Sequence, residues 1–205
     1  MPDPDYEAIR LRTKSVYERA AAGWDASRSR ALFERAWLDR FLALVPAGGH
    51  ILDLGCGGGE PIGAYLIEQG RRITGVDYAA SMIELARARF PDHDWIVGDM
   101  RDLDLEGPFD GVVSWDGSFH LTGEEQRALI DRLGGVLRPG APAMLTIGPV
   151  SGETEGLIEG EAVYHASLAP DDYRAAMAAA GFDGVELALE DPDCHGHSVL
   201  FAVRR

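Results

Sequence analysis

Residues 51–60 read Ile-Leu-Asp-Leu-Gly-Cys-Gly-Gly-Gly-Glu, and this stretch decides the fold class. The apolar start predicts a short buried strand, the glycines predict a tight loop, and a helix is predicted from Glu60 onward. Gly55, Gly57 and Gly59 allow the backbone to approach a ligand closely, and the helix N-terminus behind them offers free N–H groups. The stretch therefore predicts a strand–loop–helix unit that binds a ligand.

The glycine loop differs from a dinucleotide-binding loop in two respects. The dinucleotide pattern requires a third glycine three positions after its second, where this chain has Glu60. Asp53 stands at the end of the strand, where its charge would repel a pyrophosphate. A carboxylate there suits a ligand with positive groups, such as an ammonium near a sulfonium.

The rest of the chain predicts an α/β fold with a mostly parallel sheet. Strands are predicted at 51–54, 73–76, 95–97, 109–114 and 143–147, and they alternate with helices at 60–69, 80–89 and 123–137. This alternation implies right-handed crossovers between parallel strands. Near the C-terminus, a helix at 170–180 precedes two strands, 184–190 and 198–203, which we expect to form an antiparallel hairpin.

Two segments outside this alternation are expected to cover the site. Helices are predicted at 5–22 and 29–44, ahead of the first strand. Residues 148–160, rich in Gly and Glu, are expected to form either a mobile loop over the active face or a plain surface connection. The longer segment 148–169 is expected to wall a pocket.

Two further acids follow the next two predicted strands. Asp77 ends the second strand, where an acid accepts hydrogen bonds from ribose hydroxyls. Asp99 follows the third strand, where an acid accepts from an exocyclic adenine amine while Met100 packs on the ring. Because the carboxyl ends of parallel strands converge on one crevice, Asp53, Asp77 and Asp99 are expected to wall a single pocket.

Five segments together resemble the successive motifs of class I S-adenosylmethionine-dependent methyltransferases. They are 52–59, 75–77, 98–100, 109–113 and 137–140, in the usual order and spacing. The resemblance is strong over 49–148 and weak in the flanks. It implies a Rossmann-like seven-stranded, mostly parallel sheet with an antiparallel last strand, helices on both faces and an N-terminal helical lid. It also implies one domain over 1–205, divided into a lid (1–46), a cofactor-binding core (47–148) and a substrate-side segment (149–205).

The resemblance assigns residues to the cofactor S-adenosylmethionine. The glycine loop holds the methionine part, Asp77 holds the ribose, and Asp99 with Met100 holds the adenine. Trp115 falls where relatives touch the methionine amino group, and Tyr17 with Trp24 look like the aromatic pair that closes over the methyl group. The alternative for that pair is anchoring the helix to the core. The implied cofactor-binding set is Asp53, Gly55, Cys56, Gly57, Gly59, Asp77, Tyr78, Asp99, Met100, Trp115, Tyr17 and Trp24.

Residues 115–121 depart from many relatives and resemble a small, poorly characterised bacterial group of methyltransferases. Segments 164–168 and 190–192 look similar to the same group, which supplies no substrate. Three residues are candidate bases for an acceptor that must lose a proton: His120, His165 and Asp116. For both histidines a packing role is the alternative. Cys56 is expected to be a small packing residue and not a nucleophile.

Composition narrows the class of partner. The chain has 205 residues and a net charge of -15, which disfavours phosphate backbones and anionic membranes. Two cysteines give no disulfide framework, and the charged start lacks the apolar core of a secretory signal, so a cytoplasmic location is expected. The motif Cys194-His195-Gly196-His197 lacks a second ligand pair, so no metal site is predicted. We expect a monomer or homodimer acting on a small acceptor.

Three functions follow from this sequence. The first is methyl transfer from S-adenosylmethionine to a small molecule, which the motifs favour. The second is an NAD-type oxidoreductase, which Glu60 and Asp53 disfavour. The third is a non-catalytic protein that binds an adenosyl cofactor, which the histidines near the predicted pocket disfavour.

Overall fold

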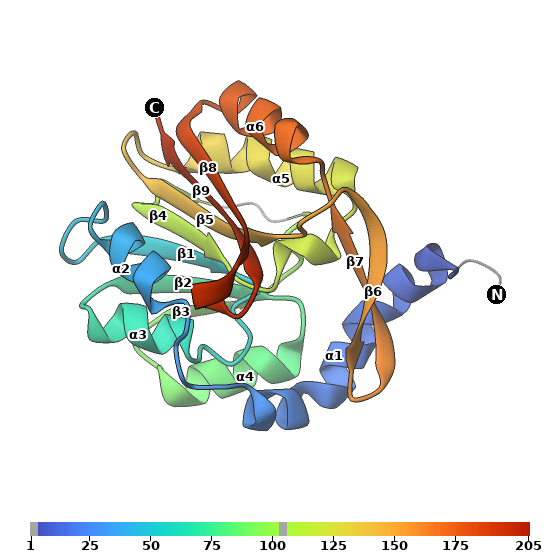
Figure 1. Cartoon of the computed structure of the whole chain (residues 1–205). Helices are drawn as coiled ribbons and strands as arrows, with labels where there is room; N and C mark the ends of the chain where they lie inside the picture. Colours follow the sequence, from blue (N-terminus) through green and yellow to red (C-terminus); the bar gives the residue numbers. More distant parts are fainter. Residues whose placement is uncertain (1–3, 103–105) are drawn as a thin grey trace.

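A seven-stranded sheet forms the centre of the protein, whose computed structural model describes residues 4–102 and 106–205 (Figure 1). The strand order is β3-β2-β1-β4-β5-β9-β8, and β9 runs antiparallel to both of its neighbours. The strands are β1 (His50–Leu54), β2 (Arg72–Asp77), β3 (Asp94–Val97), β4 (Gly111–Ser114), β5 (Pro142–Ile147), β8 (Phe182–Asp191) and β9 (His197–Arg204). The predicted mostly parallel sheet with an antiparallel last strand is confirmed.

Helices cover both faces of this sheet, as predicted. The helices are α1 (Tyr6–Ser27), α2 (Arg35–Leu42), α3 (Ile62–Glu68), α4 (Ala80–Arg89), α5 (Gly123–Val136) and α6 (Pro170–Ala179). Helices α5 and α6 pack on one face and α2, α3 and α4 on the other. Strands β1, β4 and β5 are buried along almost their whole length. Two-sided cover explains why they read as nearly continuous apolar runs.

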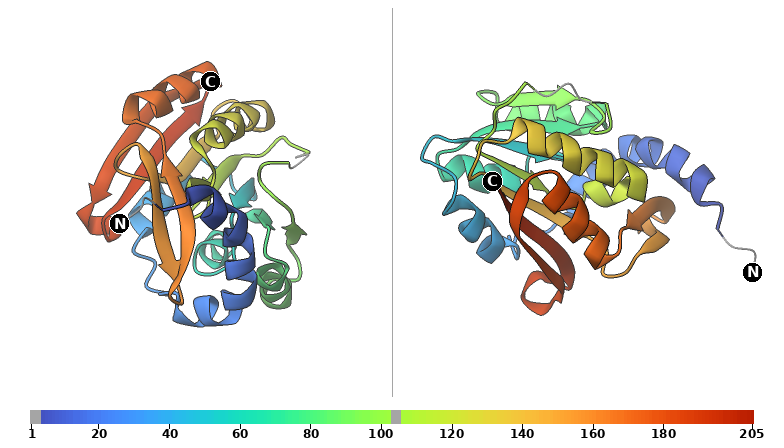
Figure 2. Two further views of the ribbon diagram at one scale, coloured as in Figure 1. Left: turned by 90° about the vertical axis from the view of Figure 1, so that its right-hand side faces the viewer. Right: turned by 90° about the horizontal axis from the view of Figure 1, so that it is seen from above.

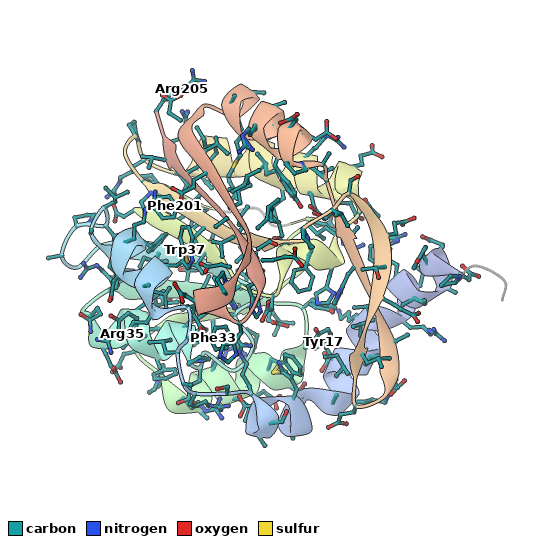
Figure 3. The ribbon with its side chains drawn as sticks, viewed as in Figure 1. Tyr17, Phe33, Arg35, Trp37, Phe201 and Arg205 are labelled. Carbon is teal, nitrogen blue, oxygen red and sulfur yellow. The ribbon has the colours of Figure 1, made fainter. Side chains whose placement is uncertain are left out.

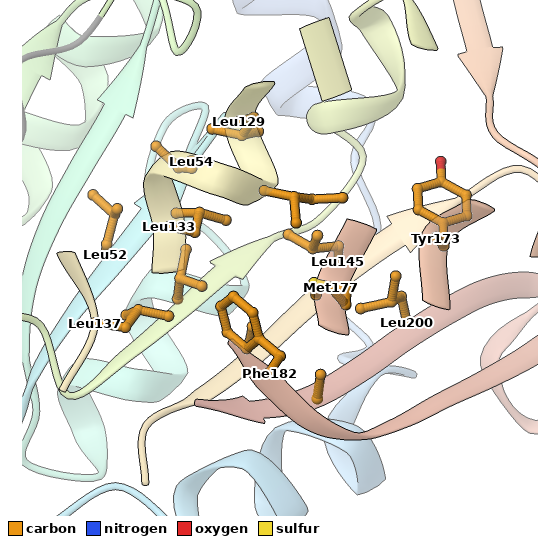
Figure 4. Packing of buried hydrophobic residues seen from close by; sticks show 14 of the residues in the cluster. Leu52, Leu54, Leu129, Leu133, Leu137, Leu145, Tyr173, Met177, Phe182 and Leu200 are labelled. Carbon is orange, nitrogen blue, oxygen red and sulfur yellow. The ribbon is translucent and has the colours of Figure 1, made fainter. Parts of the chain in front are cut away.

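Alternate residues of each central strand supply the two cores. Leu52 faces α5, where it joins Leu133 and Leu137 (Figure 4). Ile51 faces the opposite helices and packs in one cluster with Leu38. All are almost completely buried, and each such side chain stabilises the fold by about 1.5–3 kcal/mol relative to exposure. The two cores hold β2, β1 and β4 as parallel neighbours, so their carboxyl ends lie at the same edge of the sheet.

Three sequence predictions were wrong in detail. The first predicted helix continues to Ser27, so Trp24 lies within α1. The predicted helix at 29–44 shrinks to α2 (Arg35–Leu42), because Leu32 has a left-handed φ of 49° that interrupts a helix. The tip of the predicted hairpin at 191–197 also contains a short 3-10 helix, η2 (Pro192–Cys194).

The expected loop at 148–160 is instead a strand of a separate hairpin. Strands β6 (Gly152–Ile158) and β7 (Glu161–Ser167) pair antiparallel, away from the main sheet. The glycines and glutamates of β6 do not predict a strand, because its extended conformation depends on pairing with β7. The hairpin packs against α1 beyond the carboxyl ends of the parallel strands (Figure 2).

Helix α1 is held across this end of the molecule by polar contacts as well. Ala79, the N-cap residue of α4, provides no capping side chain. Glu18 of α1 replaces it, because its carboxylate accepts from the Ala80 N–H (2.7 Å) and from the Ser81 N–H and Oγ. Helix α1 therefore caps α4 from outside the core.

Candidate functional site

A cavity of about 250 Å³ opens at the carboxyl ends of the parallel strands, beneath α1. The three acids predicted to wall one pocket, Asp53, Asp77 and Asp99, all line it. They stand at the ends of β1 and β2 and just after β3, which are neighbouring strands in the sheet. The structure thus brings together what the sequence predicted from strand ends.

The glycine loop forms the floor of this cavity. Gly55 has a left-handed φ of 75°, which residues with a side chain rarely adopt. A Cβ at this position would also lie only 3.0 Å from the Gly117 Cα, so there is no space for a side chain. The N–H groups of Gly55 and Cys56 both donate to the Val76 carbonyl, which fastens the loop to β2. The loop is therefore fixed in position before any ligand arrives.

Asp53 is a buried carboxylate that receives no hydrogen bond from any residue of 4–102 or 106–205. It is 3% exposed, and burial, with the nearby Asp77 charge, raises its pKa to about 7 although Arg28 opposes the shift. A buried carboxyl without donors is costly when ionised, and a cationic ligand relieves that cost. The position suits an ammonium group.

Asp77 differs because backbone donors already hold it. Its Oδ2 accepts from the Gly57 N–H (3.0 Å) and its Oδ1 from the Ala79 N–H (2.8 Å). Burial raises its pKa to about 6, against the opposing effect of these two donors. The carboxylate is thereby oriented between the glycine loop and α4, and each oxygen retains a lone pair toward the cavity.

Arg101 binds the Asp99 carboxylate, a contact that the sequence did not predict. The guanidinium donates to Oδ1 (2.9 Å) and to Oδ2 (2.6 Å), and the Arg101 N–H donates to Oδ1 as well. Burial alone would raise the pKa of the Asp99 carboxyl, but these hydrogen bonds outweigh it and lower the pKa. Any amine that binds at Asp99 shares the carboxylate with this arginine.

The other predicted cofactor residues also line the cavity. They are Gly55, Cys56, Gly57, Tyr78, Met100, Trp115, Tyr17 and Trp24; Gly59 alone lies just behind it, against Trp95. Among the described residues, the Tyr78 hydroxyl and the Trp115 Nε1 are buried without a hydrogen-bond partner. Burial raises the pKa of the Cys56 thiol, so this cysteine is a protonated packing residue and a poor nucleophile.

Tyr17 and Trp24 reach the cavity from α1. Their rings meet edge to face with centroids 6.0 Å apart, and Figure 3 shows Tyr17 directed from α1 toward the interior. Both rings also pack with Val16 and Ala20 against the β6–β7 hairpin. The two alternatives considered for this pair therefore coincide, since the rings line the cavity and anchor the helix.

The three candidate bases occupy different environments. His120, in the 3-10 helix η1 (Ser118–His120), lines the cavity; its Nδ1 lies 2.7 Å from the Tyr164 carbonyl and its Nε2 lies 3.0 Å from the Tyr17 hydroxyl. Because a carbonyl only accepts, Nδ1 carries the proton and Nε2 accepts from Tyr17. Burial, reinforced by His165, lowers the pKa of His120 to about 4.

Asp116 lines the cavity, whereas His165 does not. The Asp116 carboxylate lies 3.2 Å from both Arg28 Nη1 and His197 Nε2. Burial would raise its pKa, but these two partners lower it, which makes the carboxylate a weak base. His165 packs behind His120 with ring centroids 4.9 Å apart, and burial lowers its pKa. The segment 148–169 was expected to wall the pocket, but it acts only indirectly: Tyr164 contacts His120, and His120 lines the cavity.

Sequence reasoning missed the charged residues that α1 and its following turn bring to the cavity. Arg28, just past α1, lines the cavity beside Asp116. Asp25 forms two hydrogen bonds with Arg89 of α4, at 2.7 and 2.5 Å, above the Gly58 carbonyl. Only the unusual density of arginines in residues 28–35 hinted at such contacts.

Neither a metal cluster nor a membrane span emerges from the described residues. Residues 4–102 and 106–205 contain no group of three or more His, Cys, Asp or Glu side chains arranged to hold a metal ion. In the same ranges, no helix combines the length and apolarity needed to cross a bilayer. The Cys194–His197 turn instead packs its histidines against Phe33 and Trp115.

A glycine loop after β1, acids after three adjacent strands, and this strand order define the class I methyltransferase fold. Residues 51–140 match the family model described as a methyltransferase domain, so the chain carries such a domain and the sequence-based recognition is confirmed. The match begins at β1 and ends between α5 and β5.

Named relatives support the same family. The putative methyltransferase YqeM of Bacillus subtilis (strain 168) is 34% identical over 102 residues, which are 48% of this chain and 40% of that protein. The cypemycin N-terminal methyltransferase of a Streptomyces species is also 34% identical over 102 residues, 48% of this chain and 41% of that protein. The chain spans less than half the length of these relatives.

Solved structures share the fold over nearly the whole chain. CalS10, an amino pentose methyltransferase from Micromonospora echinaspora, superposes with a TM-score of 0.71 at 23% identity, covering 93% of this chain and 97% of CalS10. Magnesium protoporphyrin IX methyltransferase from Synechocystis PCC 6803 gives 0.68 at 18% identity, covering 99% and 98%. Both of those structures contain bound S-adenosylmethionine.

Proposed function

We propose that the protein binds S-adenosylmethionine in this cavity and transfers its methyl group to a small-molecule acceptor. The main support is the convergence of Asp53, Asp77 and Asp99 on one cavity over a glycine loop. Asp53 carries particular weight, because a buried carboxyl without donors among the described residues calls for a cationic partner. A pyrophosphate cofactor would place negative charge against it.

The residues around the cavity fit this cofactor. We assign the ammonium to Asp53, the ribose hydroxyls to Asp77, and the adenine amine to Asp99 beside Met100. The unpartnered Tyr78 hydroxyl and Trp115 Nε1 leave two polar atoms for the same ligand. Arg28 provides a guanidinium at the glycine-loop end, opposite in charge to the methionine carboxylate.

When bound, the cofactor supplies a methyl group already activated by its positive sulfur, so the protein's main task is alignment. Tyr17 and Trp24 cover the cavity from α1 and exclude water. The β6–β7 hairpin holds this helix in place, because Thr13 Oγ1 accepts from the Tyr164 N–H (2.9 Å). Closure and alignment thus depend on the same packing.

Tyr17 and His120 provide a route for a proton. A proton on an acceptor oxygen or nitrogen would become strongly acidic as that atom gained the methyl group, and the protein's own residues would have to remove it. Its path runs to the Tyr17 hydroxyl oxygen as the Tyr17 proton passes to Nε2 of His120, whose lone pair already accepts the Tyr17 hydrogen bond. A pKa near 4 is low for a base, but it is adequate for a proton acidified by bond formation.

A small acceptor is favoured over a macromolecule. Helix α1, which packs against the β6–β7 hairpin, covers the cavity, and the net charge of -15 disfavours nucleic acid. Among the similar proteins, the name of the cypemycin enzyme refers to an N-terminus and that of CalS10 to an amino pentose, so the acceptors of these two proteins differ. The proposal therefore covers a small molecule with an acidifiable O–H or N–H.

Calorimetry and a turnover assay test the proposal. We expect S-adenosylmethionine to bind and Asp77→Ala to weaken binding by about 100-fold, since two backbone donors then lose their acceptor and the ribose loses its partner. Release of S-adenosylhomocysteine in the presence of an acceptor panel would establish turnover. An exposed acid, Asp92, offers a matched Asp92→Ala control that leaves binding unchanged.

Three outcomes would contradict the proposed function. Tight NADH binding without S-adenosylmethionine binding would favour an oxidoreductase. Unchanged affinity in Asp77→Ala would show that the cavity is not the cofactor site. Binding without turnover on any acceptor in the panel would indicate a non-catalytic adenosyl-binding protein.

A further inference from the structure

The turn between β8 and β9 places a histidine directly behind the wall of the site. His197, the first residue of β9, reaches the loop after β4 and lies 3.2 Å from the Asp116 carboxylate. Asp116 in turn lies 3.2 Å from Arg28, which follows α1. Asp116 and Arg28 line the cavity, whereas His197 stands behind them.

The geometry of His197 requires a charged imidazole. Its Nδ1 lies 2.9 Å from the Cys194 carbonyl, and its Nε2 lies 3.2 Å from an Asp116 carboxylate oxygen. Both partners can only accept, so each ring nitrogen must carry a proton. The ring also stacks on Trp115 with centroids 5.3 Å apart, which fixes its plane.

The surroundings of the imidazolium balance its charge. Glu34 is fully buried, its two oxygens have no hydrogen-bond partner among the described residues, and it lies 3.8 Å from Arg28 Nη2. The network therefore holds two cations and two acids. Titratable and charged groups surround His197 on several elements. They are Arg28 after α1, Glu34 at the start of α2, Asp116 after β4, and Cys194 and His195 in the turn of His197 itself.

We propose that His197 is a positioning residue: its imidazolium holds the Asp116 carboxylate, and through it the Arg28 guanidinium, at the glycine-loop end of the cavity. This inference rests on the proposed function in one respect, the assignment of Arg28 to the cofactor carboxylate. Asp116 has a left-handed φ of 54°, which persists only where the surrounding structure holds it, and its N–H donates to Thr146 Oγ1 (2.7 Å). The side chain is held separately, by Arg28 and His197.

The proposal has a definite pH signature. Asp116 raises the pKa of His197 above its ordinary value of 6.5, and burial opposes the shift. A raised pKa in the folded state means that the contribution of the imidazolium is complete below the ordinary value and is lost as pH rises through the folded value. Cofactor affinity is therefore expected to decline on the alkaline side.

Nitrogen NMR on the full-length, histidine-labelled protein tests the charge directly. The chain has six histidines, and the His197 resonances are assigned by their loss in His197→Gln. We expect both ring nitrogens of His197 to be protonated at neutral pH, with a midpoint above 6.5. A neutral ring at neutral pH would overturn the proposal, whatever the protein binds.

Calorimetry with S-adenosylmethionine then tests the positioning role between about pH 6 and about pH 9. Wild-type affinity is expected to fall as His197 loses its charge. His197→Gln keeps one donor without charge, so its affinity is expected to be about tenfold weaker at low pH and to lack the alkaline decline. Asp53, whose pKa is about 7, titrates in both proteins, so its effect cancels when the two pH profiles are compared. The control is His195→Asn on the same turn, which removes the stacking on Phe33 and leaves the ion network intact.

The outcomes separate this inference from the proposed function. If the wild type binds and His197→Gln shows the same affinity and pH profile, the positioning role is wrong and the cofactor assignment stands. If the wild type binds no S-adenosylmethionine at any pH, the proposed function fails, and the role of Arg28 inferred here fails with it.

Discussion

Replacement of Glu18 tests whether α1 caps α4 across the cavity. Glu18 supplies the only side-chain acceptor that the described residues offer to the first N–H groups of α4, those of Ala80 (2.7 Å) and Ser81 (3.4 Å). Loss of an N-cap acceptor costs about 1–2 kcal/mol. For a chain of this length, that free energy corresponds to a fall in Tm of about 2–8 °C in Glu18→Ala.

Thermal unfolding and amide hydrogen exchange measure this effect. The Ala80 and Ser81 amides are expected to exchange faster in Glu18→Ala, because their acceptor is removed. Glu18→Gln retains an acceptor oxygen without the charge that favours a helix N-terminus, so its Tm is expected to lie between those of the wild type and Glu18→Ala. Glu84, exposed on α4 itself, provides the control Glu84→Ala, expected within about 0.5 kcal/mol of wild type.

Acid titration tests the capping role of Glu18 in a second way, through the pH dependence of stability. Burial would raise the pKa of Glu18, but the Ala80 and Ser81 donors outweigh burial and lower the pKa. A lowered pKa means that the contribution is present above the ordinary value of 4.5 and is lost as pH falls through the folded value. If Glu18→Ala unfolds at the wild-type temperature and its α4 amides exchange at the wild-type rate, the capping role is refuted.

Three further predictions concern the cavity. Gly55→Ala is expected to destabilise the protein by more than the roughly 1–2 kcal/mol of a left-handed alanine, because its Cβ meets Gly117; Gly70→Ala, with a similar φ of 73° and open space, is the control in chemical denaturation. Burial raises the pKa of Asp53 to about 7, so the folded state keeps this proton at a higher pH than the unfolded state does, and stability declines as pH rises from about 4 to about 7. Asp53→Asn should flatten that part of the stability profile, and an unchanged profile would contradict the burial argument. Tyr17→Phe is expected to lower kcat by about 100-fold with little change in cofactor affinity, and equal kcat would exclude the proton route through His120.

The sequence alone predicted the parallel sheet, its antiparallel last strand and most of its helices. These features are local: strands of four to ten residues and amphipathic helices show their period within a short window. The convergence of Asp53, Asp77 and Asp99 was also predictable, because parallel strands must end at the same edge of a sheet. The Gly- and Glu-rich strand β6 was missed, since its strand conformation depends on β7 and α1.

Only the tertiary structure decided which distant side chains complete the site. Tyr17 and His120 are separated by 103 positions, and Asp116 and Arg28 by 88, so no short-range period records their contacts. Packing of α1 and the β6–β7 hairpin brought His120 to the cavity and left His165 behind it. The sequence determined the glycine loop and the three strand-end acids, because their placement follows from strand order; the ion pairs of α1 and its following turn depend on how separate elements pack.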